Sequence, residues 1–244
     1  MKKRIVQMSC LGQFGGLGNQ IFQYAFGKKF AQLADAEFRH PRWIFGETLF
    51  NNIEITPPLV EGIASLPLDF VPRVDDDFEI IDLFGYFQNS EHLSFLREEE
   101  LREWFELHKV FLPMIKSLRG EQKVTVHIRR GDYLKAQNVF CSISLNCYLR
   151  FLDEIGFLKK RLHFVEQKSS DPRDAIVDFL TLMSSKYLVR ANSTFSLWAG
   201  FLGNNQVYSP CVEDKVGWSE DVSFVKGNFP PICRTTSSFP FGRS

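Results

Sequence analysis

The stretch VTVHIRRGDYL, residues 124–134, predicts how this chain folds. The opening letters VTVHI favour a strand, and three basic side chains, His127, Arg129 and Arg130, stand at the point where that strand must end. Alternation places His127 and Arg129 on one face and Arg130 on the other, and the turn at Gly131 lets both arginines reach past the strand. We therefore predict a strand that ends in an anion-binding loop. An edge strand whose charges lie in water and pair with Asp132 is the alternative.

Two further segments repeat this design of a short strand, a loop and a helix. In residues 4–34, the strand RIVQMSC leads through LGQFGGLGNQ into a helical pattern with one apolar stripe. In residues 186–203, a strand runs into Asn192, Ser193 and Thr194 before a helix. Strands that alternate with helices favour an α/β fold with largely parallel sheets, in which ligands bind beyond the carboxyl ends of the strands.

The residue types at these loops suit an anion. Two guanidiniums beside an imidazole can donate paired, charge-assisted hydrogen bonds to a diphosphate, and Asp132 can orient one of them. Ser193 and Thr194 begin a helix, where hydroxyls and backbone N–H groups can bind phosphate. The simpler interpretation of these two residues is a helix cap.

The glycine-rich loop matches neither common nucleotide motif. Gly12, Gly15, Gly16 and Gly18 do not form the dinucleotide pattern, because Ile21 stands where glycine or alanine is required, and no P-loop is present. A dinucleotide-dependent oxidoreductase is therefore disfavoured. The loop predicts either close backbone contact with a ligand or a tight structural turn.

Composition limits the partners. The 244 residues include 29 basic and 29 acidic side chains, so the formal net charge is zero and no global field attracts nucleic acid. Five cysteines at irregular spacing favour reduced thiols and a cytoplasmic protein. No stretch is long and apolar enough for a transmembrane segment, while peripheral membrane contact stays open.

The chain divides into two halves and a tail. A charged, helical pattern over residues 90–122 separates the glycine-rich half from the arginine-rich half. We place an N-terminal Rossmann-like half at residues 1–112, a C-terminal Rossmann-like half at 113–226, and an irregular tail at 227–244.

Four stretches taken in order, GGLGNQIFQYAFG, GYFQNSEHL, VHIRRGDYL and LMSSKYLVRANSTFSLWAGFL, resemble the motifs of the bacterial alpha-1,2-fucosyltransferases of glycosyltransferase family 11. The similarity extends from about residue 12 to about residue 210. The resemblance implies a GT-B-like fold, two Rossmann-like halves with a cleft between them. It also implies inverting transfer of L-fucose from GDP-L-fucose, bound mainly by the second half, to the 2-hydroxyl of a terminal galactose on a glycan acceptor, without metal or cofactor.

The resemblance also implies roles for single residues. Arg129 and Arg130 correspond to a diphosphate clamp, His127 to a contact on the nucleotide side, and Asp132 to the acidic residue of the same motif. Ser193 and Thr194 correspond to phosphate donors at a helix terminus. The residues of the first half that face fucose and acceptor are Gly15, Gly16, Gly18 and Asn19. We assign catalytic roles to Arg129, Asp132 and Asn19, and no residue to a metal.

Some segments depart from the family pattern. HFVEQKSSDP, residues 163–172, replaces an F-S-D-D sequence and leaves Glu166 and Asp171 as substitutes for guanine recognition. A catalytically weak nucleotide-sugar-binding homologue, or a fucosyltransferase of different linkage, is therefore the alternative function. The D-x-D within Asp75–Asp77 holds a metal in glycosyltransferases of another fold, but here we expect a solvated turn. No motif residue identifies the general base.

Overall fold

A computed structural model describes residues 3–119, 124–131, 133–166, 171–212 and 215–228. It divides into two compact units, residues 1–108 and 109–244. The sequence prediction placed this division at 112/113. Residues 109–119 form a 3-10 turn, η1 (Lys109–Phe111), and helix α5 (Leu112–Arg119). Because α5 packs against α7 (Pro172–Ser184), this segment belongs with the second unit.

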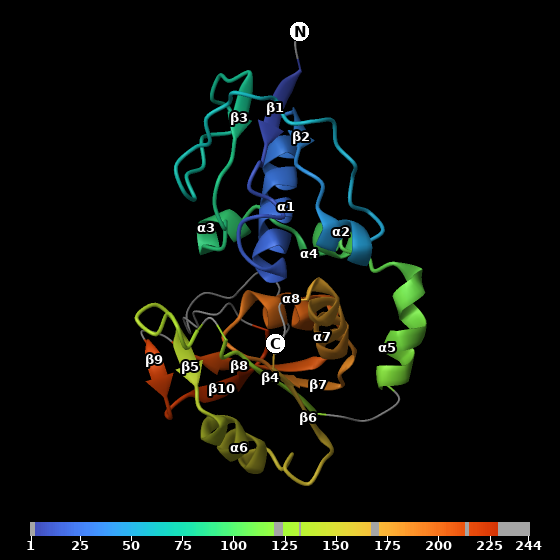
Figure 1. Ribbon diagram of the computed structural model, residues 1–244, viewed down its shortest axis with the longest axis vertical. Helices are drawn as coiled ribbons and strands as arrows, with labels where there is room; N and C mark the ends of the chain where they lie inside the picture. The colour runs from blue at the N-terminus through green and yellow to red at the C-terminus, as the bar shows by residue number, and fades with distance from the viewer. Residues whose placement is uncertain (1–2, 120–123, 132, 167–170, 213–214, 229–244) are drawn as a thin grey trace. The chain divides into compact units, whose positions relative to one another are not determined.

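The first unit is built on a parallel sheet of three strands in the order β2-β1-β3. Its strands and helices are β1 (Arg4–Gln7), α1 (Leu17–Leu33), β2 (Ala36–Arg39), α2 (Ile44–Leu49), β3 (Ile80–Asp82), α3 (Ser90–Leu93) and α4 (Glu98–Trp104). Helix α1 packs against β1 and β2 (Figure 1). The chain between β1 and β2 thus forms the predicted strand, glycine-rich loop and helix.

Helix α1 is buried along most of its length, so the predicted single apolar stripe is wrong. Its buried residues include the charged Lys28 and Lys29. Each ammonium has a carboxylate partner, Glu54 at 2.7 Å from Lys28 and Glu100 at 2.6 Å from Lys29. Buried charges require such partners, and the sequence pattern alone did not indicate them.

The second unit contains a five-stranded sheet in the order β10-β8-β7-β4-β6 and a two-stranded sheet, β5-β9. Strands β4, β6, β7 and β8 are parallel, and β10 is antiparallel to β8. The bounds are β4 (Val124–Ile128), β5 (Cys141–Ile143), α6 (Leu145–Glu154), β6 (Leu162–Glu166), β7 (Tyr187–Val189), α8 (Thr194–Leu202), β8 (Gln206–Cys211), β9 (Gly217–Ser219) and β10 (Ser223–Lys226). The predicted α/β fold with largely parallel sheets is confirmed.

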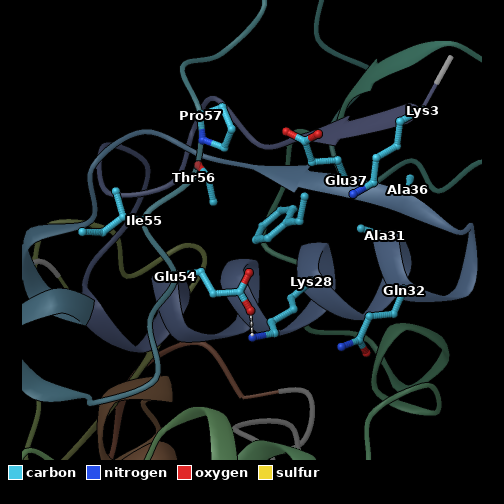
Figure 2. A pocket seen from close by; sticks show the side chains of 11 residues that line it. Lys3, Lys28, Ala31, Gln32, Ala36, Glu37, Glu54, Ile55, Thr56 and Pro57 are labelled. Carbon is cyan, nitrogen blue, oxygen red and sulfur yellow. Dashed lines mark hydrogen bonds and ion pairs between the residues drawn. The ribbon is translucent and has the colours of Figure 1, made fainter.

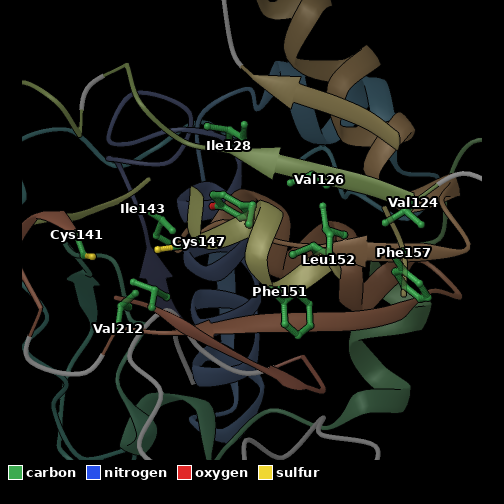
Figure 3. Close-up of a cluster of buried hydrophobic side chains, with 13 residues drawn as sticks. Val124, Val126, Ile128, Cys141, Ile143, Cys147, Phe151, Leu152, Phe157 and Val212 are labelled. Atoms are coloured by element: carbon green, nitrogen blue, oxygen red, sulfur yellow. The ribbon is translucent and has the colours of Figure 1, made fainter. Parts of the chain in front are cut away.

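The core of the second unit explains why β4 holds its register. Val124, Val126 and Ile128 lie in an apolar cluster with side chains of α6 (Figure 3). The intervening residue His127 points to the other face, where its ring lies 5.8 Å from that of Phe195 in α8. A slip of one residue would bring the imidazole into the apolar cluster, so burial on both faces fixes the strand.

The first three strands of the two main sheets are arranged in the same order. In the first unit the first strand, β1, lies between β2 and β3. In the second unit β4 lies between β6 and β7, which are reached in turn along the chain. In each sheet the chain first adds a strand on one side of the first strand and then crosses over to add the next strand on its other side. Such a change of direction is called a switch point, and open α/β sheets bind ligands there. In the described part of the chain, no helix has the length and apolar character to span a membrane.

Candidate functional site

The switch point of the second unit collects charged side chains. Arg129 and Arg130 follow β4, Glu166 ends β6, and Arg190 follows β7. Since these strands are parallel neighbours, their carboxyl ends meet at one edge of the sheet. The prediction that the strand ends just before Arg129 and Arg130 is confirmed. Anion binding by this loop stays a prediction, and Arg190 adds a cation that the sequence did not indicate.

His127 is a buried, neutral member of this edge. Its side chain is 1% exposed. Burial, and then the positive charges of Arg129 and Arg190, lower its pKa to about 3. Its Nδ1 atom has no hydrogen-bond partner among the described residues. A neutral imidazole can donate one hydrogen bond and accept another, which suits a contact with a ligand better than a further fixed charge would.

Arg129 lies beside an aromatic ring that joins two loops. Its guanidinium carbon is 5.5 Å from the centroid of Tyr133. The hydroxyl of Tyr133 donates a 2.6 Å hydrogen bond to the backbone oxygen of Asn192. The loop after β4 is therefore tied to the loop after β7, which restricts the position of Arg129 relative to the start of α8.

Arg130 lies on the other side of β4, as the alternation predicted. Its Nη1 atom is 3.9 Å from Oε1 of Glu166, at the limit of an ion pair, and its Nε has no partner among the described residues. Burial raises the pKa of the nearby Tyr148, and the charges of Arg130 and Arg190 oppose that rise. A loosely paired guanidinium leaves capacity to bind an anion.

Arg190 is fully buried, and its Nη1 atom is tied to helix α8 through Asn228. Nη1 donates to Oδ1 of Asn228 at 3.0 Å, and Nδ2 of Asn228 donates to the backbone oxygen of Leu197 at 2.9 Å. This chain of bonds fixes Arg190 against helix α8. The available signal in the sequence was an arginine that interrupts the apolar run YLV-R-A, a position where a buried strand tolerates charge only with partners.

Ser193 and Thr194 begin helix α8, as predicted. Ser193 is the N-cap, and its hydroxyl oxygen accepts from the backbone N–H of Phe195 at 3.3 Å. Ser193 is buried, whereas Thr194 is half-buried. The capping role is thus confirmed, and the role of both residues as phosphate donors stays a prediction. Asp132, the predicted acidic partner, lies outside the described residues.

The predicted glycines and Asn19 belong to the first unit. Gly15 has a φ of 81°, and an added Cβ would lie 2.5 Å from Nδ2 of Asn19. Gly16 caps α1 with an ordinary φ of −79°, and a Cβ there would meet open space. Gly18 is buried in the first helical turn, and Asn19 accepts a 3.0 Å hydrogen bond from Gln88. Local structure therefore requires glycine at position 15 but not at position 16, where contact with a ligand stays the prediction.

The D-x-D segment forms an exposed turn before β3. Asp75 pairs with Arg73 at 2.8 Å, and the carboxylate of Asp76 accepts from the backbone N–H of Arg73. Throughout the described residues, no three His, Cys, Asp or Glu side chains are grouped as metal ligands. These carboxylates serve the turn.

A pocket of about 340 Å³ in the first unit lies elsewhere (Figure 2). The Lys28–Glu54 ion pair lines it, together with Ala36 and Phe38 at the start and middle of β2. The pocket thus lies beside the β2 edge of the sheet, whereas the switch point is between the carboxyl ends of β1 and β3. We do not assign it to the candidate site.

Fold and site together define a protein with two Rossmann-like units, the second of which carries an arginine-rich edge. The model of glycosyl transferase family 11 matches residues 81–210, and the chain belongs to this family of glycosyltransferases. The chain is 28% identical to the alpha-1,2-colitosyltransferase of Escherichia coli in an alignment that covers 78% of this chain and 86% of that protein.

A solved structure shares the fold. A mutant of Arabidopsis thaliana FUT1 in complex with GDP matches with a TM-score of 0.51 and 14% identity, over 86% of this chain and 70% of that chain. FUT1 has the GT-B fold, so the predicted GT-B-like class is confirmed. The matched family segment begins at β3 and ends within β8, and it includes the whole arginine-rich edge.

Proposed function

We propose that this glycosyltransferase transfers L-fucose from GDP-L-fucose to the 2-hydroxyl of a terminal galactose, with inversion at the anomeric carbon. The observation that carries the proposal is the arginine-rich edge at the β4/β7 switch point of a family 11 chain. The solved relative binds GDP, and the E. coli relative is named for an alpha-1,2 transfer. The GDP complex supports a guanine nucleotide donor, and the name of the E. coli relative supports this linkage.

The chemistry explains why the edge needs several cations. The oxygen of the galactose 2-hydroxyl attacks the anomeric carbon and gives up its proton to solvent, while the bond from that carbon to the phosphate oxygen breaks and its electron pair remains on GDP. The sugar passes through an oxocarbenium-like state. Stabilising the charge that grows on the diphosphate is the main electrostatic task. In the proposal Arg129 and Arg130 bind the diphosphate, the start of α8 donates through Ser193 and Thr194, and neutral His127 contacts the nucleotide side.

The proposal requires no metal or other cofactor, because fixed guanidiniums supply the charge that Mg²⁺ supplies elsewhere. Incubating the protein with GDP-L-fucose and lactose, followed by mass spectrometry and linkage analysis, tests the reaction. We expect a product with fucose on the 2-hydroxyl of galactose, and an unchanged rate in excess EDTA. Loss of activity in EDTA that Mg²⁺ or Mn²⁺ restores would refute metal independence. Another linkage in the product would refute the acceptor position.

A second donor follows from the E. coli relative, which is named for colitose. Colitose is L-fucose without its 3-hydroxyl, so the two donors differ by one hydrogen-bonding group. A site built to bind that hydroxyl disfavours the deoxy sugar strongly, whereas a site that does not contact it distinguishes the two weakly. Comparing kcat/KM for GDP-L-fucose and GDP-colitose therefore decides which sugar is the donor. GDP binding without transfer from either donor would identify a weak binding homologue instead.

A further inference from the structure

A group of stacked aromatic rings lies at the switch point of the first unit. Phe14, from the loop after β1, stacks on Tyr86, from the loop after β3, with centroids 4.4 Å apart and an interplanar angle of 21°. Phe84 completes the group at 4.9 Å from Phe14. All three rings are half-buried. They form an apolar surface, the ring surface, at the carboxyl edge between β1 and β3.

The backbone beneath the ring surface is held by side-chain hydrogen bonds from Gln23 and Asp69. The side-chain amide of Gln23, in α1, donates to the backbone oxygens of both Phe14 and Gly85 at 3.0 Å, and so links the two loops. One carboxylate oxygen of Asp69 accepts from the backbone N–H groups of Tyr86 at 2.6 Å and Phe87 at 2.8 Å. Gln23 is fully buried. These contacts fix the rings before any ligand arrives, which lowers the entropic cost of binding.

The two loops that carry the ring surface are themselves uncharged, and the nearby carboxylate of Asp69 accepts hydrogen bonds from their backbone. Residues 10–16 and 83–88, the two loops that carry the rings, contain no charged side chain. Gln88 follows the rings and donates a 3.0 Å hydrogen bond to Asn19. Primary amides both donate and accept hydrogen bonds, as sugar hydroxyls do. The arginine-rich edge of the second unit suits a diphosphate, whereas this surface suits a neutral, polar ligand with an apolar face.

We propose that the ring surface binds a pyranose ring of the neutral glycan acceptor, with Gln88 and Asn19 as partners for its hydroxyls. The C–H groups on one face of a pyranose are weakly positive and pack on the negative face of an aromatic ring. The inference rests on the proposed function, because it names the surface that binds the acceptor of that reaction. It assigns specificity to Phe14 and Tyr86 rather than to the glycines alone.

Steady-state kinetics of Tyr86→Leu and Phe14→Leu test the proposal. Leucine keeps apolar volume but removes the aromatic face, so we expect the acceptor KM to rise about tenfold in each variant. The KM for GDP-L-fucose and the slow hydrolysis of the donor by water are expected to stay unchanged. Tyr86→Phe keeps the ring and should restore the acceptor KM. Phe95→Leu, at an exposed aromatic in the same unit, is the matched control.

Binding measured without transfer separates this inference from the proposed function. Saturation-transfer NMR with methyl β-galactoside should show contact with the wild-type protein and weaker contact with Tyr86→Leu, whether or not fucose is transferred. Transfer with an unchanged acceptor KM in both leucine variants would overturn the ring surface and leave the reaction standing. An equal rise in the donor KM would overturn it too, because the rings would then support the fold or the donor site.

Discussion

His127 makes the stability of the second unit depend on pH. The imidazole is buried beside Arg129 and Arg190, and its pKa falls from 6.5 to about 3. In the unfolded chain the same group takes up a proton near pH 6.5. Between these two values the unfolded state binds one more proton than the folded state, so folding becomes weaker as the pH falls. Above pH 6.5 the imidazole is neutral in both states and costs no stability. Below pH 6.5 the loss of stability grows until the pH reaches the folded pKa of about 3.

The size of the effect follows from the gap between the two pKa values. Each pH unit inside the gap costs about 1.4 kcal/mol of unfolding free energy, so lowering the pH from about 7 to about 5 costs about 2 kcal/mol from this one residue. Burial also lowers the pKa values of His40 and His92, so these groups add to the pH dependence of stability. A variant that removes only His127 isolates its share.

Urea unfolding of the wild-type protein and of His127→Gln, followed by circular dichroism at several pH values, measures that share. We expect the free-energy difference between the two proteins to change by about 2 kcal/mol between about pH 7 and pH 5, to the disadvantage of the wild type. NMR of the His127 ring offers a direct check, since its shifts should stay constant down to about pH 4. Parallel stability curves, or a ring that titrates near its ordinary pKa, would refute the burial argument.

The remaining predictions concern single residues of the two switch points. Arg129→Ala should lower kcat by about 100-fold without changing the melting temperature, while Arg173→Ala, at an exposed arginine of the same unit, should leave kcat intact. Near-normal turnover of Arg129→Ala would contradict the clamp. Gly15→Ala should destabilise the protein by about 1–3 kcal/mol because of its positive φ and the contact with Asn19, whereas Gly16→Ala should change stability by less than about 1 kcal/mol and reduce activity. Urea unfolding and initial rates separate the two, and unaltered activity of Gly16→Ala would remove its ligand role. Arg190→Met should cost about 1–3 kcal/mol in urea unfolding, because it leaves Oδ1 of Asn228 without this donor, and an unchanged midpoint would contradict that account.

The sequence predicted most of what lies along single strands and helices. The end of β4 and the N-cap at Ser193 could be located because turn and cap residues act within a few positions of the chain. Helix α1 was expected after Gln20 but begins at Leu17, within the glycine-rich stretch. Arg190 could not be assigned, because its partner Asn228 is distant in sequence and only the folded sheet brings the two together. The same holds for the buried lysines of α1, whose carboxylate partners lie on other segments.

The ring surface likewise could not be predicted from local sequence patterns. Tyr86 stands in a stretch that resembles a family motif and Phe14 directly precedes another, yet neither stretch indicates that their rings stack. Strand order supplies that information, since β1 and β3 are neighbours although β2 lies between them in the chain. Local sequence patterns therefore do not show which two loops meet at a switch point, whereas the strand order does.

Under the proposed function, one strand order with two loop chemistries lets a single architecture bind a donor in one unit and an acceptor in the other. The loops after β1 and β3 lie at one edge of the first sheet, and the loops after β4 and β7 lie at the corresponding edge of the second sheet. In the second unit those loops carry arginines beside a neutral imidazole, which suit a charge that grows during the reaction. In the first unit they carry fixed rings and amides, which suit a ligand whose charge does not change. Exchanging loops within a constant sheet alters the ligand without altering the fold, so loop residues rather than core residues are where members of this family should differ in substrate.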